Sequence, residues 1–135
     1  MRSATLVLPI LLVSLVPAAA QREAGNGQKP CREHPQVVAP CFTIRGRMSL
    51  YDGVPTVRIW RVGTGRMLGV SEQRFAVAGY SNLPDAILDR LSWDVDLFAD
   101  FVVCPFTRDA PGAMQRVCVA SARNVITRPR DGVPP

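Results

Sequence analysis

The chain has 135 residues, with 16 Lys and Arg against 11 Asp and Glu, and a formal net charge of +5. This length fits one domain with a modest core. The basic balance favours anionic partners, and the alternative is that the positive charge only keeps the protein soluble.

The first 20 residues predict a cleaved signal peptide. Arg2 supplies the positive start, residues 6–16 are mostly apolar, and Ala18-Ala19-Ala20 offers small residues for cleavage. A membrane anchor is the alternative, but crossing a bilayer takes about 20 apolar residues, more than this run has. We therefore expect a protein exported to the periplasm or secreted, with no stable membrane insertion after signal cleavage.

Composition divides the remainder of the chain into three parts. Residues 21–40 are rich in Gly, Pro and polar side chains, which predicts an extended, partly disordered lead-in. Residues 41–127 carry the periodic patterns and are expected to form a disulfide-stapled β-barrel domain. Residues 128–135 contain three prolines and predict a flexible tail.

Three strands are expected first along the folded part. Residues 42–51 alternate between apolar and polar side chains, as a half-buried strand does. Asp52-Gly53 supplies a turn, because glycine tolerates a positive φ. Shorter alternating runs at residues 56–62 and 66–71 predict the next two strands, which would form a meander with the first.

A helix and two more strands follow. Pro84 suits a first helical turn, and apolar side chains at helical spacing predict a short helix over residues 84–91. Residues 93–103 alternate most strongly, with Asp94, Asp96 and Asp100 on the outer face. A last strand is expected near residues 116–122.

This order of elements predicts a mainly β fold. Three strands, one short helix and two strands is the order of a five-stranded OB-like barrel with its helix between strands 3 and 4. Gly46 would allow the sharp bend that the first strand of a barrel needs. A small β-sandwich, or a sheet with one helix across it, would give a similar pattern.

Four cysteines in an exported chain predict two disulfides. Cys104 and Cys118 are equidistant from the turn at Pro111, so they should face each other across a hairpin and bond. Cys31 and Cys41 then remain to pair. A zinc site at Cys31, His34 and Cys41 is the alternative, but a fourth ligand is missing. No metal or other cofactor is expected.

Basic and aromatic side chains alternate on the outer faces of the first two predicted strands. Such a surface can bind an anionic polymer, or stack on sugars or bases. The candidate ligand-binding residues are Arg45, Arg47, Tyr51, Arg58 and Trp60. An unidentified protein of the bacterial envelope is the other partner considered.

The aspartates of the fourth strand support two alternatives. In an OB-like barrel the first strand pairs with the fourth, so cross-strand pairs with Asp94, Asp96 and Asp100 could neutralise Arg45 and Arg47. Arg58 and Trp60 would lie further from the acidic strand and are the better candidates. Asp94 and Asp96 could instead hold a cation, but no calcium-loop pattern surrounds them.

The sequence does not favour an enzyme. His34 is the single histidine and lies in the predicted lead-in, away from any Ser–His–Asp or Cys–His arrangement on the core. No phosphate loop or dinucleotide motif is present. A hydrolase using Asp94 and Asp96 is a third possibility, although these residues are predicted on an outer face rather than in a cleft.

Several segments carry a resemblance. These are Phe42-Thr-Ile-Arg-Gly-Arg-Met-Ser, Arg58-Ile-Trp-Arg-Val-Gly-Thr followed by Leu68-Gly-Val, Asp100-Phe-Val-Val-Cys-Pro-Phe, and Val117-Cys-Val. With them the chain resembles a group of small exported bacterial proteins of unassigned function. The resemblance implies an exported bacterial setting and assigns no functional residue. We thus expect a non-enzymatic binding module, with a structural or interaction protein of the envelope as the alternative.

Overall fold

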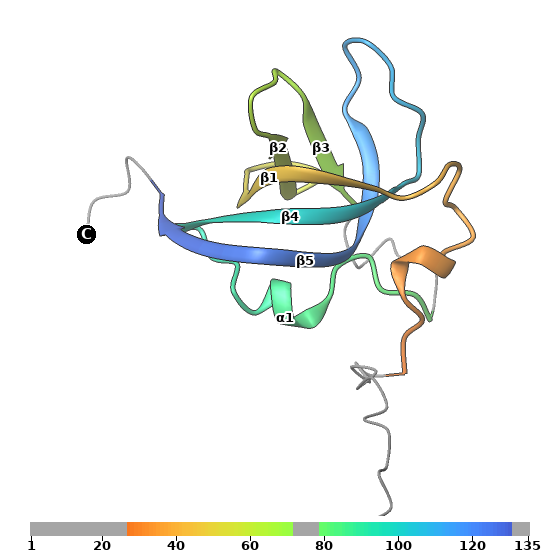
Figure 1. Ribbon diagram of the computed structural model, residues 1–135, viewed down its shortest axis with the longest axis horizontal. Helices are drawn as coiled ribbons and strands as arrows, with labels where there is room; N and C mark the ends of the chain where they lie inside the picture. Colours follow the sequence, from red (N-terminus) through yellow and green to blue (C-terminus); the bar gives the residue numbers. More distant parts are fainter. Residues whose placement is uncertain (1–26, 72–78, 131–135) are drawn as a thin grey trace, which may run out of the picture.

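The computed structural model describes residues 27–71 and 79–130 and is mainly β. One mixed sheet closes on itself in a ring, in the strand order β1-β2-β3-β5-β4 (Figure 1). All neighbouring strands are antiparallel except β3 and β5, which are parallel. The strands are β1 (Phe42–Leu50), β2 (Val57–Arg61), β3 (Met67–Val70), β4 (Val95–Pro105) and β5 (Gln115–Pro129).

All five predicted strands are present, and the last differs most in length. The sequence predicted it only near residues 116–122, whereas β5 runs to Pro129, which pairs with Val95. The long β4 supplies a partner along the whole of this extension. Pairing therefore holds Arg128 and Pro129 in the sheet, although composition assigned them to a tail.

The helix expected over residues 84–91 is reduced to one turn, α1 (Asp85–Leu88). The backbone N–H of Asp89 still bonds to the carbonyl of Asp85, but the chain then turns toward β4. Ile87 points into the core, and α1 lies beside β5 in the ribbon view (Figure 1). The segment thus contributes Ile87 to the core from one helical turn rather than from a longer helix.

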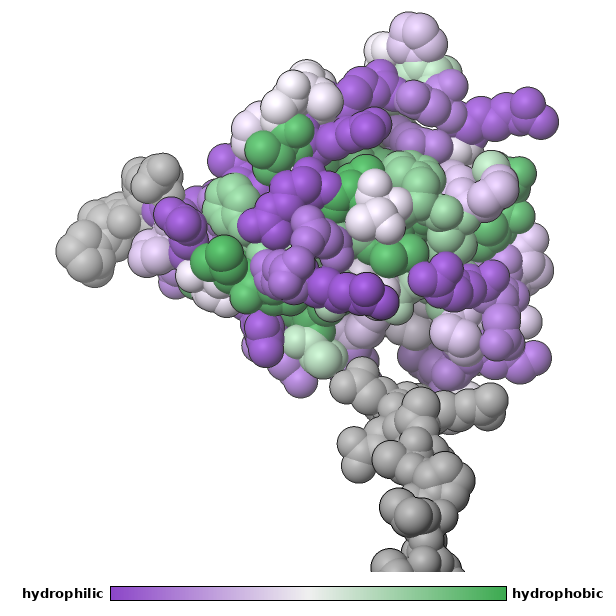
Figure 2. Space-filling model, in the orientation of Figure 1, coloured by the Kyte–Doolittle hydropathy of each residue, from purple (hydrophilic) through white to green (hydrophobic). Residues whose placement is uncertain are grey.

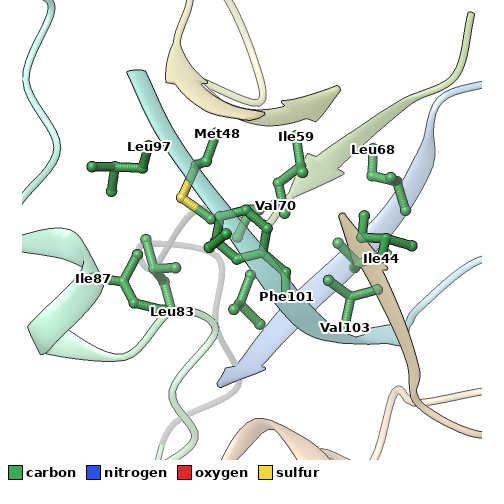
Figure 3. Close-up of a cluster of buried hydrophobic side chains, with 13 residues drawn as sticks. Ile44, Met48, Ile59, Leu68, Val70, Leu83, Ile87, Leu97, Phe101 and Val103 are labelled. Atoms are coloured by element: carbon green, nitrogen blue, oxygen red, sulfur yellow. The ribbon is translucent and has the colours of Figure 1, made fainter. Parts of the chain in front are cut away.

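Residues that alternate along the strands fill the interior of the ring. Phe101 lies at the centre, with Met48 and Val103 close to it and Leu83 and Ile87 on the α1 side (Figure 3). Phe101, Met48 and Val103 are all fully buried. The apolar sides of the first, second and fourth alternating runs thus point inward, except at Trp93, which the alternation also placed inward but which precedes β4 and is 52 % exposed.

Gly46 lies at the tightest point of this core. A Cβ atom there would lie 2.5 Å from Cγ2 of Ile59 and 3.1 Å from the Phe101 ring. We expect Gly46→Ala to lower the free energy of unfolding by about 1–3 kcal/mol, because overpacking forces neighbours from their rotamers. Denaturant unfolding measures the change. The matched control is Gly65→Ala, which meets nothing within 4 Å and should be nearly neutral; equal midpoints for the two variants would contradict this reason.

The described part of the predicted lead-in packs on the domain. Its backbone exchanges hydrogen bonds with a distant loop, from the N–H of Lys29 to the carbonyl of Gly79 and from the N–H of Ser81 to the carbonyl of Lys29. A 3-10 turn, η1 (Cys31–Glu33), follows, and His34 is only 3 % exposed. Apart from residues 21–26, which lie outside the described residues, this segment is not the partly disordered chain that its composition predicted.

The disulfide pairing predicted from the hairpin is wrong. Cys31 bonds to Cys118, and Cys41 bonds to Cys104, with Cα–Cα distances of 5.8 and 4.1 Å. Cys104 and Cys118 do lie opposite each other on β4 and β5, as the midpoint argument required.

The pairing follows from the strand on the other side of β4. Phe42 pairs with Val103 across β1 and β4, which brings the preceding Cys41 beside Cys104. Cys104 thus has a neighbouring cysteine on each side, and its bond forms to Cys41. Cys118 is left for Cys31, which η1 places against β5. Equal distance from the turn at Pro111 gives β4 one neighbouring strand only, whereas in a closed sheet every strand has two.

Within the described residues, no helix has the length and apolar character needed to cross a bilayer.

Candidate functional site

The outer faces of four strands bring together what we call the arginine face. It contains Arg45, Arg47, Arg58, Arg123, Arg128 and Arg130, together with the rings of Tyr51, Trp60 and Phe98. The register places Arg47 between two of these rings, opposite Trp60 on β2 and Phe98 on β4. The pairing of the strands alone therefore places charged and aromatic side chains next to one another across the sheet.

A single carboxylate lies in the middle of this face. The Asp96 side chain is 9 % exposed, and the hydroxyl of Ser49 donates a 2.5 Å hydrogen bond to it. Arg130 Nε lies 3.9 Å from one carboxylate oxygen, and Arg47 Nε lies 4.0 Å from the other. One negative charge is thus shared by two arginines.

The rings are covered by guanidinium groups. The Tyr51 centroid lies 5.1 Å from Cζ of Arg58 and 4.9 Å from Cζ of Arg130. Arg47 lies 5.1 Å from the Trp60 centroid. Such contacts stabilise a cation by about 0.5–1 kcal/mol at exposed positions and hold the guanidinium planes in place. The arginines are therefore positioned by aromatic rings as well as by carboxylates.

The positive charge of Arg45, at one end of the arginine face, is neutralised by an aspartate. Arg45 pairs in register with Asp100, and their side chains lie 3.4 Å apart. The side-chain amide of Asn124 donates a 2.7 Å hydrogen bond to the same carboxylate. This hydrogen bond, followed by the charge of Arg45, lowers the pKa of Asp100 below its ordinary value. The predicted Arg–Asp pairing thus accounts for Arg45.

Arg58 and Trp60 each also bind backbone. Arg58 donates hydrogen bonds to the carbonyls of Pro55 and Asp52, at 3.0 and 3.1 Å. Trp60 donates from Nε1 to the carbonyl of Thr64 at 2.6 Å. Both residues therefore order the loops beside β2, and among the described residues no carboxylate lies within 4.0 Å of the Arg58 guanidinium.

The structure brings most of the predicted site residues together. Arg47 and Trp60 form one contact, and Tyr51 and Arg58 form another, while Arg45 lies in the neutralised end. Sequence reasoning missed Arg128 and Arg130, because both were assigned to the tail. Their spacing of two, continuing the alternation from Ile126, is the signal that would have placed them on one face.

Polar and apolar side chains are intermingled on the molecular face that Figure 2 shows. Hydrophilic residues, drawn in purple, border and interrupt the apolar ones in green, which gather right of the centre in this view (Figure 2).

The described residues contain one group of side chains that could hold a metal ion, namely Cys31, Cys104 and Cys118. All three are in disulfides, as is Cys41, so the Cys31, His34 and Cys41 alternative lacks free thiolates. The Asp96 carboxylate is engaged by Ser49 and two arginines, which does not favour the cation alternative with Asp94.

His34 is buried between two rings instead of lying in a flexible segment. Its ring centroid lies 4.5 Å from that of Phe106 and 5.1 Å from that of Tyr80. Nδ1 accepts a 3.1 Å hydrogen bond from the backbone N–H of Gln36, so the neutral ring carries its proton on Nε2. Burial lowers the pKa of His34 below 6.5, because the charged ring would lose solvation.

We expect acid to weaken the domain through His34. The unfolded chain takes up a proton near pH 6.5 and the folded chain only at lower pH, so stability falls as the pH drops below about 6.5. Urea unfolding at pH 7.5 and 5.0 measures the loss, and His34→Phe should reduce it. The Asp100 carboxyl, whose pKa is lowered from 3.8, loses its contribution only as the pH falls from about that value, which is below this range. An equal loss in wild type and His34→Phe would contradict this assignment.

Comparison of the chain with family models, with curated proteins and with solved structures finds no match in any of the three. The candidate function therefore rests on the residues and geometry described above.

Proposed function

We propose that this protein is an exported, non-enzymatic binding module that takes an anionic polymer on the arginine face. The observation that carries the proposal is the sharing of Asp96 by Arg47 and Arg130, beside an Arg58 with no carboxylate partner among the described residues. This part of the face has more fixed positive charge than its own aspartates balance. An anionic ligand would supply the missing charge.

We further propose that the closed sheet is an OB-like barrel. Its support is the strand order β1-β2-β3-β5-β4, which agrees with that five-stranded Greek-key fold. OB-folds bind ligands mainly on strands 2 and 3 and the adjoining loops. Here a Cβ on Gly69 of β3 would lie 2.5 Å from Pro55 and 2.9 Å from Met114, so loop residues fill that surface.

The ligand surface we propose therefore leaves out β3 and extends from β2 across β1 to β4 and β5. Guanidinium groups bind sulfate, phosphate or carboxylate groups in a bidentate manner. Partly exposed rings, such as that of Trp60, can add stacking on the units of a polymer. A polymer suits the surface better than a small molecule, because the charges are spread across four strands rather than gathered in one pocket.

A sulfated polysaccharide matrix tests the proposal. We expect Arg58→Gln/Arg130→Gln to elute at clearly lower salt than wild type, because the two positive charges next to Tyr51 are removed. The matched control, Arg32→Gln/Arg108→Gln, removes the same charge from exposed positions off the face. Equal elution shifts for the two variants would show that only net charge matters.

That second outcome would favour the alternative. In it the protein is a structural or interaction protein of the bacterial envelope, and its surface charges only keep it soluble. Circular dichroism of each variant checks that the fold is retained before its elution is compared.

A further inference from the structure

The four cysteine sulfurs lie together at one end of β4 and β5. The Sγ atoms of Cys31, Cys104 and Cys118 all lie within 4.8 Å of one another, and Cys41 is bonded to Cys104. The two disulfides are therefore neighbours, packed with Val37, Phe106 and Ala120 in a cluster separate from the main core.

Both disulfides join the same two segments. Cys31 and Cys41 belong to the segment leading into β1, and Cys104 and Cys118 form a single opposed pair in the β4–β5 hairpin. Opposed residues of an antiparallel pair are close enough to bond to each other. A second pairing of the same four sulfurs is therefore within reach, and it would release the 31–41 segment from the hairpin.

We propose that the two disulfides form a thiol–disulfide exchange centre, whose partner is an external thiol that enters at Cys41. Cys41 is partly exposed, whereas Cys31, Cys104 and Cys118 are at most 1 % exposed. Exchange begins when an external thiolate reaches a disulfide sulfur. Of the four cysteines only Cys41 is open to solvent, so the external thiolate attacks there. A small-molecule thiol, or a protein dithiol with a protruding cysteine, has the required chemistry.

The exchange proceeds in three steps without net oxidation. The external thiolate bonds to the Cys41 sulfur, and the electron pair of the broken bond leaves on Cys104. The Cys104 thiolate bonds to Cys118 and expels Cys31 as a thiolate. The Cys31 thiolate then bonds to Cys41 and expels the external thiolate. Two disulfides are present before and after, and the external thiol is regenerated.

The full chain with Cys41→Ser tests the central step without any external thiol. This variant leaves a Cys104 thiol beside the Cys31–Cys118 disulfide. On incubation near pH 8 without denaturant, we expect a Cys104–Cys118 disulfide to accumulate together with a free Cys31 thiol. Acid quenching, alkylation and mass spectrometry identify the species, since Arg32, Arg45, Arg108 and Arg116 allow trypsin to place every cysteine in its own peptide.

The matched variant Cys31→Ser tests the same exchange, starting from the other disulfide. It leaves a Cys118 thiol beside the Cys41–Cys104 disulfide, and we expect the same Cys104–Cys118 product with Cys41 now free. The proposal is overturned if the thiol remains on Cys104 in the first variant and on Cys118 in the second. If either variant loses its circular dichroism spectrum, the double variant Cys31→Ser/Cys41→Ser is used instead, under oxidising conditions. A Cys104–Cys118 bond in this variant would support the proposal. Two unreacted thiols would overturn it.

Discussion

Replacing Cys31 and Cys118 together by alanine is expected to lower the free energy of unfolding by about 3–4 kcal/mol. With the Cys41–Cys104 bond intact, the Cys31–Cys118 bond closes a loop of about 25 residues through residues 31–41 and 104–118, which the chain-entropy model values at about 3–4 kcal/mol. A small domain has little excess stability to absorb such a loss. The variant should therefore unfold at much lower urea concentration, and its own m-value converts the midpoint to free energy, because the freed unfolded chain exposes more surface.

The matched control is Cys41→Ala/Cys104→Ala, whose bond closes the same loop when the Cys31–Cys118 bond is intact. Its loss should be nearly as large, because loop entropy depends on the length of the closed loop. Counting thiols gives an independent check of the connectivity. The Cys31→Ala/Cys118→Ala variant should contain no free thiol, whereas two reactive thiols would show that the bonds run within the hairpin and within the lead-in.

The strands could be predicted because their information is local. Alternation in residues 42–51 and 93–103 predicted two strands and most of their inward side chains, such as Met48 and Phe101, although Trp93 is exposed and precedes β4. The helix was less well predicted. Leu88 fits the helical spacing of residues 84–91, but it ends the single turn and is 46 % exposed. Helical spacing over so few residues cannot distinguish a helix from a loop that buries one or two side chains.

The disulfide pairing was missed because it depends on strands that are far apart in the chain. The midpoint of Cys104 and Cys118 correctly predicted their opposition in the hairpin. The competing position of Cys41 depends on the pairing of β1 with β4, more than 50 residues later in the chain. An OB-like order implied that pairing, so a full register built from it would have placed Cys41 beside Cys104.

The candidate site was predicted in part for the same reason. Arg47, Tyr51, Arg58 and Trp60 were found from alternation within single strands. Arg130 was missed because its place depends on β5 continuing along β4 to Pro129. This residue changes the charge balance, since it shares Asp96 with Arg47. Without it, the aspartates would neutralise the first strand, as the alternative reading of the sequence expected.

Asp96 therefore occupies the position that we expect an anionic group of the ligand to approach. Its carboxylate lies between two guanidinium groups and is held there by the hydroxyl of Ser49. A fixed internal anion competes with an external one for the same cations, because each guanidinium has few donors in its plane. The carboxylate should then position Arg47 and Arg130 while lowering their affinity for the ligand.

Asp96→Asn is expected to separate these two effects. The amide oxygen can still accept the Ser49 hydrogen bond, but the negative charge is lost. We expect the free energy of unfolding to fall by about 1–2 kcal/mol, between the values for exposed and buried ion pairs. Retention on the sulfated polysaccharide should increase at the same time, by about 1 kcal/mol or roughly fivefold in affinity.

The matched control is Asp89→Asn, which removes the same charge from an exposed position after α1. If net charge alone governs retention, the two variants should elute together, and the role of Asp96 on the arginine face would be refuted. If Asp96→Asn elutes later than Asp89→Asn while unfolding more easily, then one carboxylate both stabilises the fold and opposes the ligand. A loss of stability accompanied by better binding is difficult to explain for a group that is only structural, because loosening a binding surface ordinarily weakens the binding it supports.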